Sequence, residues 1–518
     1  MQHCRLQDLW SDSSAVCLGL AYRRLASLSN PKRIVTNEFH FFGRVRWLIA
    51  HRGLQSLGGG SVMGQRHARA LGGMAFVYNA LCTTSSLHLR NMRYIVVGGS
   101  GLVGGQIVLQ LLQRGQAPSS IRIIDLVPPT RDELQTPLAK DVEFAQTDMS
   151  SEASTLAAFK KPWQATSAKL PLTVFHTAAA IRPSERHPLV YHRHARVNIG
   201  GTANVLSAAK SAGADIFIFT SSCSVALRPV TWFSPLWRRW PTNIVQTMTE
   251  DDFSAPLRPR EDFPSNYARS KAEAERHVCA ADSPVSGLRT GAIRPGNSIY
   301  GGAGDFLVSA ILNLPSLPTC TAPWVQNWAH ASNVSLAHLL LEAALLGPHV
   351  DKARIASRPF LVTDAGPPLR FDDFYTAMKA VAATFPTVRY PPPVLMMAIA
   401  RIIELWCVTL WKSPFLARLG MREPKNPLYL LQPACFTAAV NCLIDDSAAK
   451  RPVEEGGIGY QARCTTLEGI CMQLLHLNRS VPNKRVNGKE ATRSILKDVI
   501  EVKPSLGRSG SKIETTDK

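Results

Sequence analysis

The sequence predicts an α/β protein with a Rossmann-type doubly wound parallel sheet and a smaller, mixed C-terminal substrate lobe. Three observations lead to this prediction. Short β-branched runs alternate with segments of helical apolar spacing from residue 93, a glycine-rich turn follows the first run, and the alternation stops after Pro295. Strands that alternate with helices are typical of a parallel sheet covered by helices on both faces.

Each expected element follows from a local pattern. Gly115 closes the first helix, because glycine readily adopts the left-handed conformation that ends helices. Runs of Val, Ile and Phe mark the strands, and apolar residues three and four apart mark the helices. The expected strands span residues 93–97, 121–125, 142–145, 172–176, 215–220 and 288–294, and the expected helices span residues 102–113, 197–212 and 267–280.

Composition divides the chain into four parts. We expect residues 92–295 to form an NAD-binding Rossmann domain and the proline-rich residues 296–480 to form a substrate-binding lobe. Residues 481–518 are polar and charged with few large apolar groups, which predicts a disordered tail. Residues 1–91 form a poorly defined N-terminal extension.

The N-terminal extension allows three interpretations. It holds eleven Lys and Arg against Asp8, Asp12 and Glu38, a composition that fits a mitochondrial presequence. A disordered leader is the second interpretation. The third is that translation begins at Met92, which stands directly before the first expected strand.

Net charge and cysteine content limit the classes of function. The charge of +20 fits nucleic acid, an anionic membrane or a phosphate-bearing cofactor. The sequence shows no zinc finger, RNA-binding signature or basic heptad helix, so we expect no nucleic-acid partner. The eleven cysteines form no CxxC pair, which argues against a disulfide framework and a metal site and for a reducing compartment.

The glycine turn after the first strand carries the strongest local signal. Gly98 permits a tight turn, Gly101 lets the backbone approach a pyrophosphate, and Gly104 allows close packing of helix on sheet. The following helix opens with Leu102 and Val103, and its N-terminal N–H groups favour a phosphate. A purely structural turn is the alternative.

Asp125 ends the second expected strand, 21 residues after the last glycine of the turn. This position places a carboxylate on the adenosine ribose hydroxyls of a dinucleotide. The carboxylate would repel a 2′-phosphate, and the next basic residue is Arg131. The sequence therefore favours NAD over NADP, with a solvated turn aspartate as the alternative.

Tyr267 and Lys271 form a YxxxK pair on an expected helix, so phenol and ammonium share one face. A neighbouring ammonium and a positive nicotinamide would both lower the pKa of the phenol, which suits it to act as a base. Ser222, after the preceding strand, would hydrogen-bond the substrate oxygen. These residue types suit oxidation of an alcohol, in which the cofactor takes the hydride.

The segment 394–411 is apolar and about long enough to cross a bilayer. Arg401 and Glu404 lie within it and can pair on one helix face. A central ion pair is costly in a membrane span, so a helix lying in the membrane interface fits better. A buried core helix is the alternative. Basic residues that would favour anionic lipid flank the segment at Arg389, Lys412, Arg418, Arg422 and Lys425.

These motifs resemble the extended short-chain dehydrogenases, and within them the 3β-hydroxysteroid dehydrogenase/isomerase family, which includes the sterol-4α-carboxylate 3-dehydrogenases (decarboxylating). The resemblance covers about residues 92–478. The matching pieces are VGGSGLVG at 97–104, TDMS at 147–150, HTAAA at 176–180, NIGGTANVL at 198–206, TSSCSV at 220–225, YARSK at 267–271 and IRPGNSIYGGAGD at 293–305. Two later pieces are more specific, namely NWAHASNVSLAHLLLEAALL at 327–346 and FLVTDAGPPLRFDDF at 360–374.

The resemblance implies a role for each motif residue. Tyr267 is the base, Lys271 its partner and Ser222 the catalytic hydroxyl, with Ser221 the less favoured serine. It also implies that the helix at 394–411 associates with a membrane. The resemblance further implies that Asp148 approaches the adenine and that Ala178 and Ala179 line the dinucleotide path.

The function that the resemblance implies is NAD-dependent oxidation of the 3β-hydroxyl of a sterol or steroid to the 3-ketone, in steroid or sterol biosynthesis. Decarboxylation at C4 and Δ5–Δ4 isomerisation both stay open as coupled steps. A sugar-nucleotide epimerase or a flavonoid-type reductase is the alternative enzyme. A non-catalytic cofactor-binding protein is a third class, against which the intact Ser222, Tyr267 and Lys271 argue.

The expected partners are a sterol or steroid substrate and a membrane surface, and a homodimer is an allowed assembly. The expected location is an intracellular membrane, the endoplasmic reticulum facing the cytosol. Mitochondrial targeting by residues 1–91 is the alternative location.

The chain departs from the family pattern in three places. Ser222 and Tyr267 are 45 residues apart, a long gap that would hold a lid, a membrane contact or a surface loop. Gly302 stands where the family often has proline, and residues 1–91 have no counterpart. The gap is rich in large and basic residues, namely Trp232, Trp237, Arg238, Arg239 and Trp240.

Overall fold

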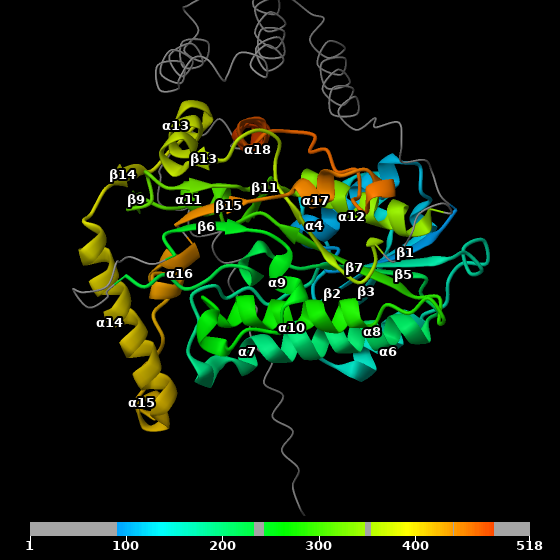
Figure 1. Cartoon of the computed structure of the whole chain (residues 1–518), viewed down its shortest axis with the longest axis horizontal. Helices are drawn as coiled ribbons and strands as arrows, with labels where there is room; N and C mark the ends of the chain where they lie inside the picture. The colour runs from blue at the N-terminus through cyan, green and yellow to red at the C-terminus, as the bar shows by residue number, and fades with distance from the viewer. Residues whose placement is uncertain (1–90, 233–242, 348–353, 439, 481–518) are drawn as a thin grey trace, which may run out of the picture.

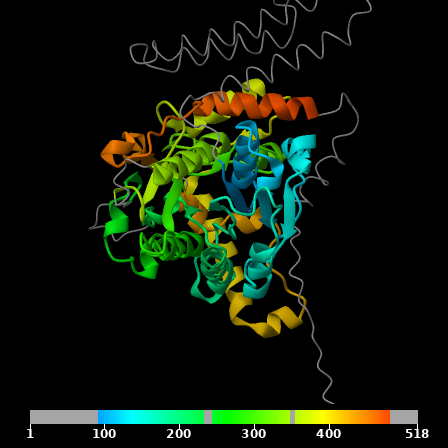
Figure 2. The same ribbon diagram turned by 90° about the vertical axis from the view of Figure 1, so that its right-hand side faces the viewer.

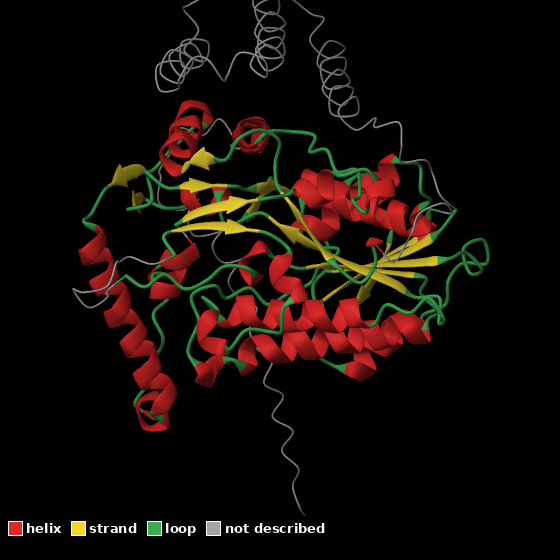
Figure 3. Cartoon of the chain, in the orientation of Figure 1, coloured by secondary structure: helices red, strands yellow, loops and turns green. Residues whose placement is uncertain are grey.

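The computed structural model describes residues 91–232, 243–347, 354–438 and 440–480. Within these residues, helices cover both faces of a central sheet, and a smaller lobe lies beside it (Figures 1 and 3). The predicted fold class is confirmed. The predictions for residues 1–90, for the tail 481–518 and for residues 237–240 lie outside the described residues.

The central sheet has seven strands that all pair in parallel. Their order is β12-β7-β5-β4-β1-β2-β3, so the direction of winding reverses between β1 and β4. Ligands of such sheets bind beside this reversal, at the carboxyl ends of the strands. The bounds are β1 Arg93–Val97, β2 Ile121–Asp125, β3 Glu143–Gln146, β4 Leu172–His176, β5 Ile216–Thr220, β7 Arg289–Pro295 and β12 Pro359–Val362.

Helices cover both faces because the strand residues are apolar on both sides. On one face, α4 and α12 share an apolar core with side chains of β1 and β2. On the other face, α6, α8 and α10 build a second core, and the two layers are visible in Figures 1 and 2. The bounds are α4 Leu102–Gln113, α6 Glu152–Lys160, α8 Thr202–Ser211, α10 Asn266–Ala280 and α12 Ala331–Leu346.

The smaller lobe is built on a four-stranded sheet of order β13-β10-β15-β6. The strands of this sheet are β6 Val245–Met248, β10 Val325–Gln326, β13 Leu369–Arg370 and β15 Asn441–Ile444. The helices of the lobe include α13 Phe371–Val381, α14 Pro393–Lys412, α15 Pro414–Arg418, α16 Pro433–Ala438 and α18 Thr466–Ser480. The short remaining elements are α5 Pro137–Lys140, α7 His192–His194, α9 Asp251–Ser254, α11 Val308–Leu312, α17 Ser447–Lys450, β8 Ile299–Tyr300, β9 Ser316–Pro318, β11 Ala329–His330 and β14 Thr387–Arg389.

The predicted domain boundary at residue 295 is wrong, because the central sheet continues beyond it. β12 adds an edge strand beside β7, with Pro359 opposite Ala292 and Val362 opposite Pro295. In the other direction, β6 belongs to the first half of the chain but pairs with β15 in the smaller sheet. The four buried residues of β12 are too few to show a strand by periodicity alone.

A buried carboxylate holds the interleaved segments together. Asp364 follows β12, and burial raises its pKa to about 6. Its Oδ1 accepts hydrogen bonds from the backbone N of His330 at 2.6 Å and from Asn333 Nδ2 at 2.7 Å. Its Oδ2 accepts from the hydroxyls of Tyr300 at 2.7 Å and Thr466 at 2.9 Å. One side chain therefore joins β8, β11, α12 and α18.

Replacing Asp364 should destabilise the protein strongly. Asp364→Ala removes the acceptor of four hydrogen bonds from buried donors, although the carbonyls of Thr466 and Cys464 remain as second acceptors for Tyr300 and Asn333. We therefore expect the free energy of unfolding to fall by about 2–4 kcal/mol. Asp364→Asn should cost less, because the hydroxyls of Tyr300 and Thr466 can turn to accept from the amide. Chemical denaturation measures the change, with Asp141→Ala at an exposed position as the control. Equal stability of Asp364→Ala and the control would contradict this role.

Candidate active site

The glycine turn after β1 lies at the reversal point of the sheet, and close packing requires its glycines. Gly98 has a φ of +85°, and a Cβ there would lie 2.6 Å from the backbone N of Ala178. A Cβ on Gly104 would collide with the carbonyl O of Gly98. Gly98 therefore allows the turn to approach the segment after β4, and Gly104 allows the first turn of α4 to pack against the glycine turn itself.

The first turn of α4 is suited to a phosphate. Its N-cap residue is Gly101, and no side chain caps the helix. The N–H groups that begin with Leu102 and Val103 are thus left for a ligand at the positive end of the helix dipole. These residues fit a dinucleotide pyrophosphate.

Asp125 lies beside the glycine turn, as the sequence predicted. Its carboxylate accepts hydrogen bonds from the backbone N of Ser100 at 3.0 Å and of Leu126 at 2.7 Å. Burial raises the pKa of this carboxyl, and these hydrogen bonds oppose the rise. The carboxylate is thereby fixed where a ribose would meet it.

The other predicted cofactor residues end neighbouring strands at the same edge of the sheet. Asp148 follows β3, is exposed, and accepts from the backbone N of Ser150 at 2.9 Å and from its hydroxyl at 2.7 Å. Ala178 and Ala179 follow β4 and are half-buried beside the glycine turn. Asp125, Asp148 and the two alanines therefore border one edge.

Tyr267 lies in the first turn of α10, which Ser265 caps by accepting from the backbone N of Ala268 at 3.2 Å. Burial raises the pKa of Tyr267 to about 12, and a hydrogen bond with Ser222 opposes this rise. The two hydroxyls that the sequence paired across 45 residues therefore meet. Ser221, in contrast, is buried, and its backbone N donates to the carbonyl of Ile293 at 2.7 Å.

Lys271 lies one helical turn after Tyr267, and its ammonium contacts the end of β5. Its Nζ donates to the carbonyl O of Thr220 at 2.5 Å and lies 3.9 Å from the centre of the Phe219 ring. Burial lowers the pKa of Lys271 to about 7. In the protein alone, burial is the largest influence on the pKa of both Tyr267 and Lys271, and the effect of the ammonium on the phenol stays a prediction.

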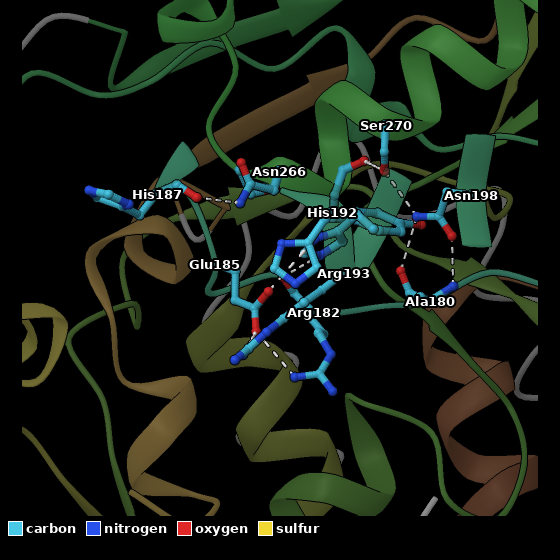
Figure 4. A network of polar contacts seen from close by, with 12 residues as sticks. Ala180, Arg182, Glu185, His187, His192, Arg193, Asn198, Asn266 and Ser270 are labelled. Carbon is cyan, nitrogen blue, oxygen red and sulfur yellow. Dashed lines mark hydrogen bonds and ion pairs between the residues drawn. The ribbon is translucent and has the colours of Figure 1, made fainter. Parts of the chain in front are cut away.

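Asn198 is a site residue that the sequence analysis missed. It lies in a π-helical turn, Ala195–Gly201, which precedes α8 and replaces the start of the helix expected at 197–212. Its Nδ2 donates to Ser270 Oγ at 2.9 Å and to the carbonyl of Ala180 at 3.1 Å (Figure 4). Ser270 Oγ donates in turn to the carbonyl of Tyr267 at 2.8 Å. Such π-helical turns are frequent at functional sites. In the sequence, the motif NIGGT, which begins with Asn198, was the signal that could have pointed to this residue.

A buried carboxylate links the start of α10 to the region around α14. Oε1 of Glu185 accepts from Arg182 Nη1 at 3.1 Å, from Arg193 Nη1 at 3.0 Å and from the Tyr429 hydroxyl at 2.6 Å. Figure 4 shows both arginines directed at this carboxylate. The carbonyl of Glu185 also accepts from the backbone N of Asn266 at 2.8 Å, next to Tyr267.

The fold and the site together define the class of protein. A glycine turn at the reversal point of a parallel sheet, with a serine–tyrosine pair and a lysine one turn further on, is the arrangement of an extended short-chain dehydrogenase. Such a protein is an oxidoreductase that depends on a nicotinamide dinucleotide.

The chain belongs to the 3-beta hydroxysteroid dehydrogenase/isomerase family, whose sequence profile matches residues 95–384. It is 26% identical over 322 residues to short-chain dehydrogenase/reductase family 42E member 1 of Mus musculus, and the aligned region covers 60% of this chain and 73% of the relative. It is also 26% identical to a Mycobacterium tuberculosis 3 beta-hydroxysteroid dehydrogenase/Delta 5→4-isomerase, over 73% of this chain and 88% of the relative. It is 27% identical to an Arabidopsis thaliana 3beta-hydroxysteroid-dehydrogenase/decarboxylase (isoform 1), over 73% of this chain and 77% of the relative.

Solved structures with a similar fold include a Thermus thermophilus UDP-glucose 4-epimerase in complex with NAD. It is 20% identical, with a TM-score of 0.46, and the match covers 75% of this chain and 100% of that chain. A Streptomyces venezuelae dTDP-glucose 4,6-dehydratase with NAD bound is 19% identical, with a TM-score of 0.47 over 75% and 98%. These likenesses concern the fold alone.

Substitution of Lys271 should separate stability from activity. Lys271→Met removes a buried ammonium while keeping the side-chain volume, so we expect the free energy of unfolding at pH 7 to rise by about 2 kcal/mol. Turnover should be lost. Denaturation curves and a cofactor-reduction assay on the same sample measure the two effects.

The pH dependence of stability tests whether burial of the Lys271 ammonium causes the gain in Lys271→Met. Because burial lowers the pKa of Lys271 from its ordinary value of 10.5 to about 7, the unfolded chain binds up to one proton more than the folded chain between these two pH values. The stability of the wild-type protein therefore rises with pH over this interval, and the advantage of Lys271→Met should shrink by pH 9.5. A variant that is less stable than the wild-type protein at both pH values would refute the burial argument.

Proposed function

We propose that the protein oxidises the 3β-hydroxyl of a sterol or steroid to the 3-ketone with NAD. The observation that most supports the proposal is that the uncapped glycine turn, Asp125 and the end of β5 before Ser222 lie at one carboxyl edge of the sheet, where Ser222 influences the buried phenol of Tyr267. The family of the chain supports the substrate class, because the relatives from M. tuberculosis and A. thaliana are both named 3β-hydroxysteroid dehydrogenases. One relative is named an isomerase and the other a decarboxylase, so the proposal stops at the oxidation that both names share.

The residues of the chain divide the work on the alcohol. Ser222 holds the substrate oxygen by a hydrogen bond, and Tyr267 accepts the hydroxyl proton. With a pKa of about 12, Tyr267 is a phenol at rest. When bound, the oxidised nicotinamide supplies the hydride acceptor and a positive charge that favours the phenolate. Lys271 holds the nicotinamide ribose from the next turn of α10.

NAD is the cofactor that we propose over NADP. The carboxylate of Asp125 is fixed by the N–H groups of Ser100 and Leu126, so it cannot easily turn away from a ribose. A 2′-phosphate at this place would face a negative charge. The preference follows from this repulsion and from the hydrogen bonds that a 2′-hydroxyl can make.

A membrane surface is the second partner that we propose, and α14 would contact it. Among the described residues, α14 is the one helix long and apolar enough to cross a membrane. Among the described residues only one of its faces is buried, which supports an interfacial helix over a buried core helix. The ion pair of Glu404 with Arg186, whose Nη2 donates at 2.7 Å, ties α14 to the body, and Arg401 pairs with the same carboxylate at 3.2 Å within the helix. The exposed apolar side chains follow a helical spacing at Val394, Leu395, Ile402, Leu405 and Trp406.

An interfacial position of α14 agrees with these contacts. The exposed apolar surface continues from α14 onto Phe415 and Leu419 of the following segment, where basic side chains can meet anionic headgroups. A lipid-soluble substrate would be supplied from such a surface. The cytosolic face of the endoplasmic reticulum remains the membrane that we propose from the family resemblance.

Activity against a substrate panel tests the catalytic proposal. Purified protein with NAD should form NADH with Δ5-3β-hydroxysteroids or 4α-carboxysterols and should leave UDP-glucose unchanged. Tyr267→Phe should lower kcat by at least about 10³-fold, because the phenyl ring cannot accept the proton, while NAD affinity stays within about threefold. The assay follows NADH absorbance, and calorimetry follows NAD binding. Inactivity across the sterol panel, or full activity of Tyr267→Phe, would overturn the proposal.

Sedimentation with vesicles tests the membrane proposal. Ile402 and Leu405 are 68% and 67% exposed, so Ile402→Asp with Leu405→Asp should leave the fold intact. The pair should weaken binding to phosphatidylserine vesicles by at least about tenfold, because each change removes apolar contact and adds negative charge. Ser207→Asp with Ser211→Asp, which adds the same charge at exposed positions of α8, is the control. Unchanged binding of the double variant would exclude this face of α14 as the contact.

A further inference from the structure

Gly302 leaves a space that an arginine occupies. It lies between β8 and α11, and its φ is outside the left-handed region, so the backbone there does not require glycine. A Cβ on Gly302 would collide with Nη2 of Arg131 and would lie 2.9 Å from Cδ1 of Leu102. The glycine, which replaces the proline common in the family, is therefore matched to the guanidinium of Arg131.

Arg131 spans the entrance to the glycine turn. It follows β2 by six residues, and its Nη1 donates to the carbonyl of Ala303 at 3.2 Å on the other side of the turn. Nη2 lies 3.4 Å from Oε1 of Glu133, and the side chain is only 12% exposed. A guanidinium has five N–H donors, and the contacts with Ala303 and Glu133 do not use all of them. Donors of Arg131 therefore remain available for another acceptor.

The position of the guanidinium indicates what that acceptor is. Leu102 is the first residue of α4. A Cβ placed on Gly302 would lie within 3 Å of both Leu102 Cδ1 and Arg131 Nη2, so these two side chains are close to each other. The guanidinium thus lies near the uncapped first turn of α4, where the helix dipole favours an anion. A planar guanidinium binds phosphate oxygens in bidentate fashion.

We propose that Arg131 binds the pyrophosphate of the dinucleotide and that Gly302 makes room for it to do so. This inference rests on the proposed dinucleotide site but not on the proposed sterol substrate. The arginine contacts Ala303, whereas Asp125 is held by Ser100 and Leu126. Arg131 therefore serves the bridging phosphates and not a 2′-phosphate on the ribose.

Ligand affinities measured by calorimetry test this role without any turnover. Arg131→Ala should weaken the binding of NAD and of ADP by about tenfold or more, because each loses a charge-assisted hydrogen bond. Adenosine, which carries no phosphate, should bind equally to the variant and the wild-type protein. Lys140→Ala removes an exposed charge from the nearby helix α5 and should leave all three affinities unchanged.

Gly302→Ala supplies an independent test, because it displaces the guanidinium without removing it. It should weaken ADP binding to a similar degree, and the double variant should bind ADP no more weakly than Arg131→Ala alone. Additive losses would show that the two residues act separately and would overturn the proposal.

Other outcomes also decide the matter. Unchanged ADP affinity in Arg131→Ala, an equal loss for adenosine, or a loss confined to NADP and 2′-AMP would each overturn it, as would wild-type protein that binds neither NAD nor ADP. A protein that binds ADP through Arg131 but oxidises no sterol would overturn the proposed function alone.

Discussion

The close approach of two backbone segments at Gly98 is the constraint on which the site depends. The turn after β1 passes so near to Ala178 that no side chain fits between them. This contact lies at the edge of the sheet where the strand order reverses, next to the uncapped start of α4. Asp125, Asp148 and the serine–tyrosine pair gain their mutual positions because their strands end at this edge.

Burial controls the electrostatics of the site more than neighbouring charges do. It raises the pKa of Tyr267, lowers the pKa of Lys271 to about 7, and leaves the ammonium against a carbonyl and an aromatic ring. Near neutral pH, Tyr267 is thus an uncharged phenol, while Lys271 is divided between its charged and neutral forms. Charge brought in by the cofactor would then act in a medium of low dielectric constant, where its effect on the phenol is large.

Local patterns predicted most of the fold and the outline of the site. The strands at 93–97, 121–125 and 172–176 were placed correctly, since their β-branched runs stand between clear turn residues. The glycine turn, Asp125 and the pairing of Ser222 with Tyr267 followed from motif spacing. The β12–β7 and β6–β15 pairings were not predictable, because four-residue strands show no periodicity and their partners lie far away in the sequence.

Side-chain interactions across the fold were hidden for the same reason. The polar contacts of Asn198 and the fit of Arg131 over Gly302 join residues from different elements, and no spacing rule connects them. The lowered pKa of Lys271 could not be predicted, because its burial depends on how α10 packs on β5. The Arg401–Glu404 pair was predictable, because it lies within one helix.

Transfer of a labelled hydride tests the central claim most directly. A 3β-hydroxysteroid that carries deuterium at C3 would be incubated with the protein and NAD, and the mass of the product NADH would be measured. The account predicts NADH heavier by one deuterium and a 3-ketone without the label. Unlabelled NADH, or no NADH at all, would contradict it.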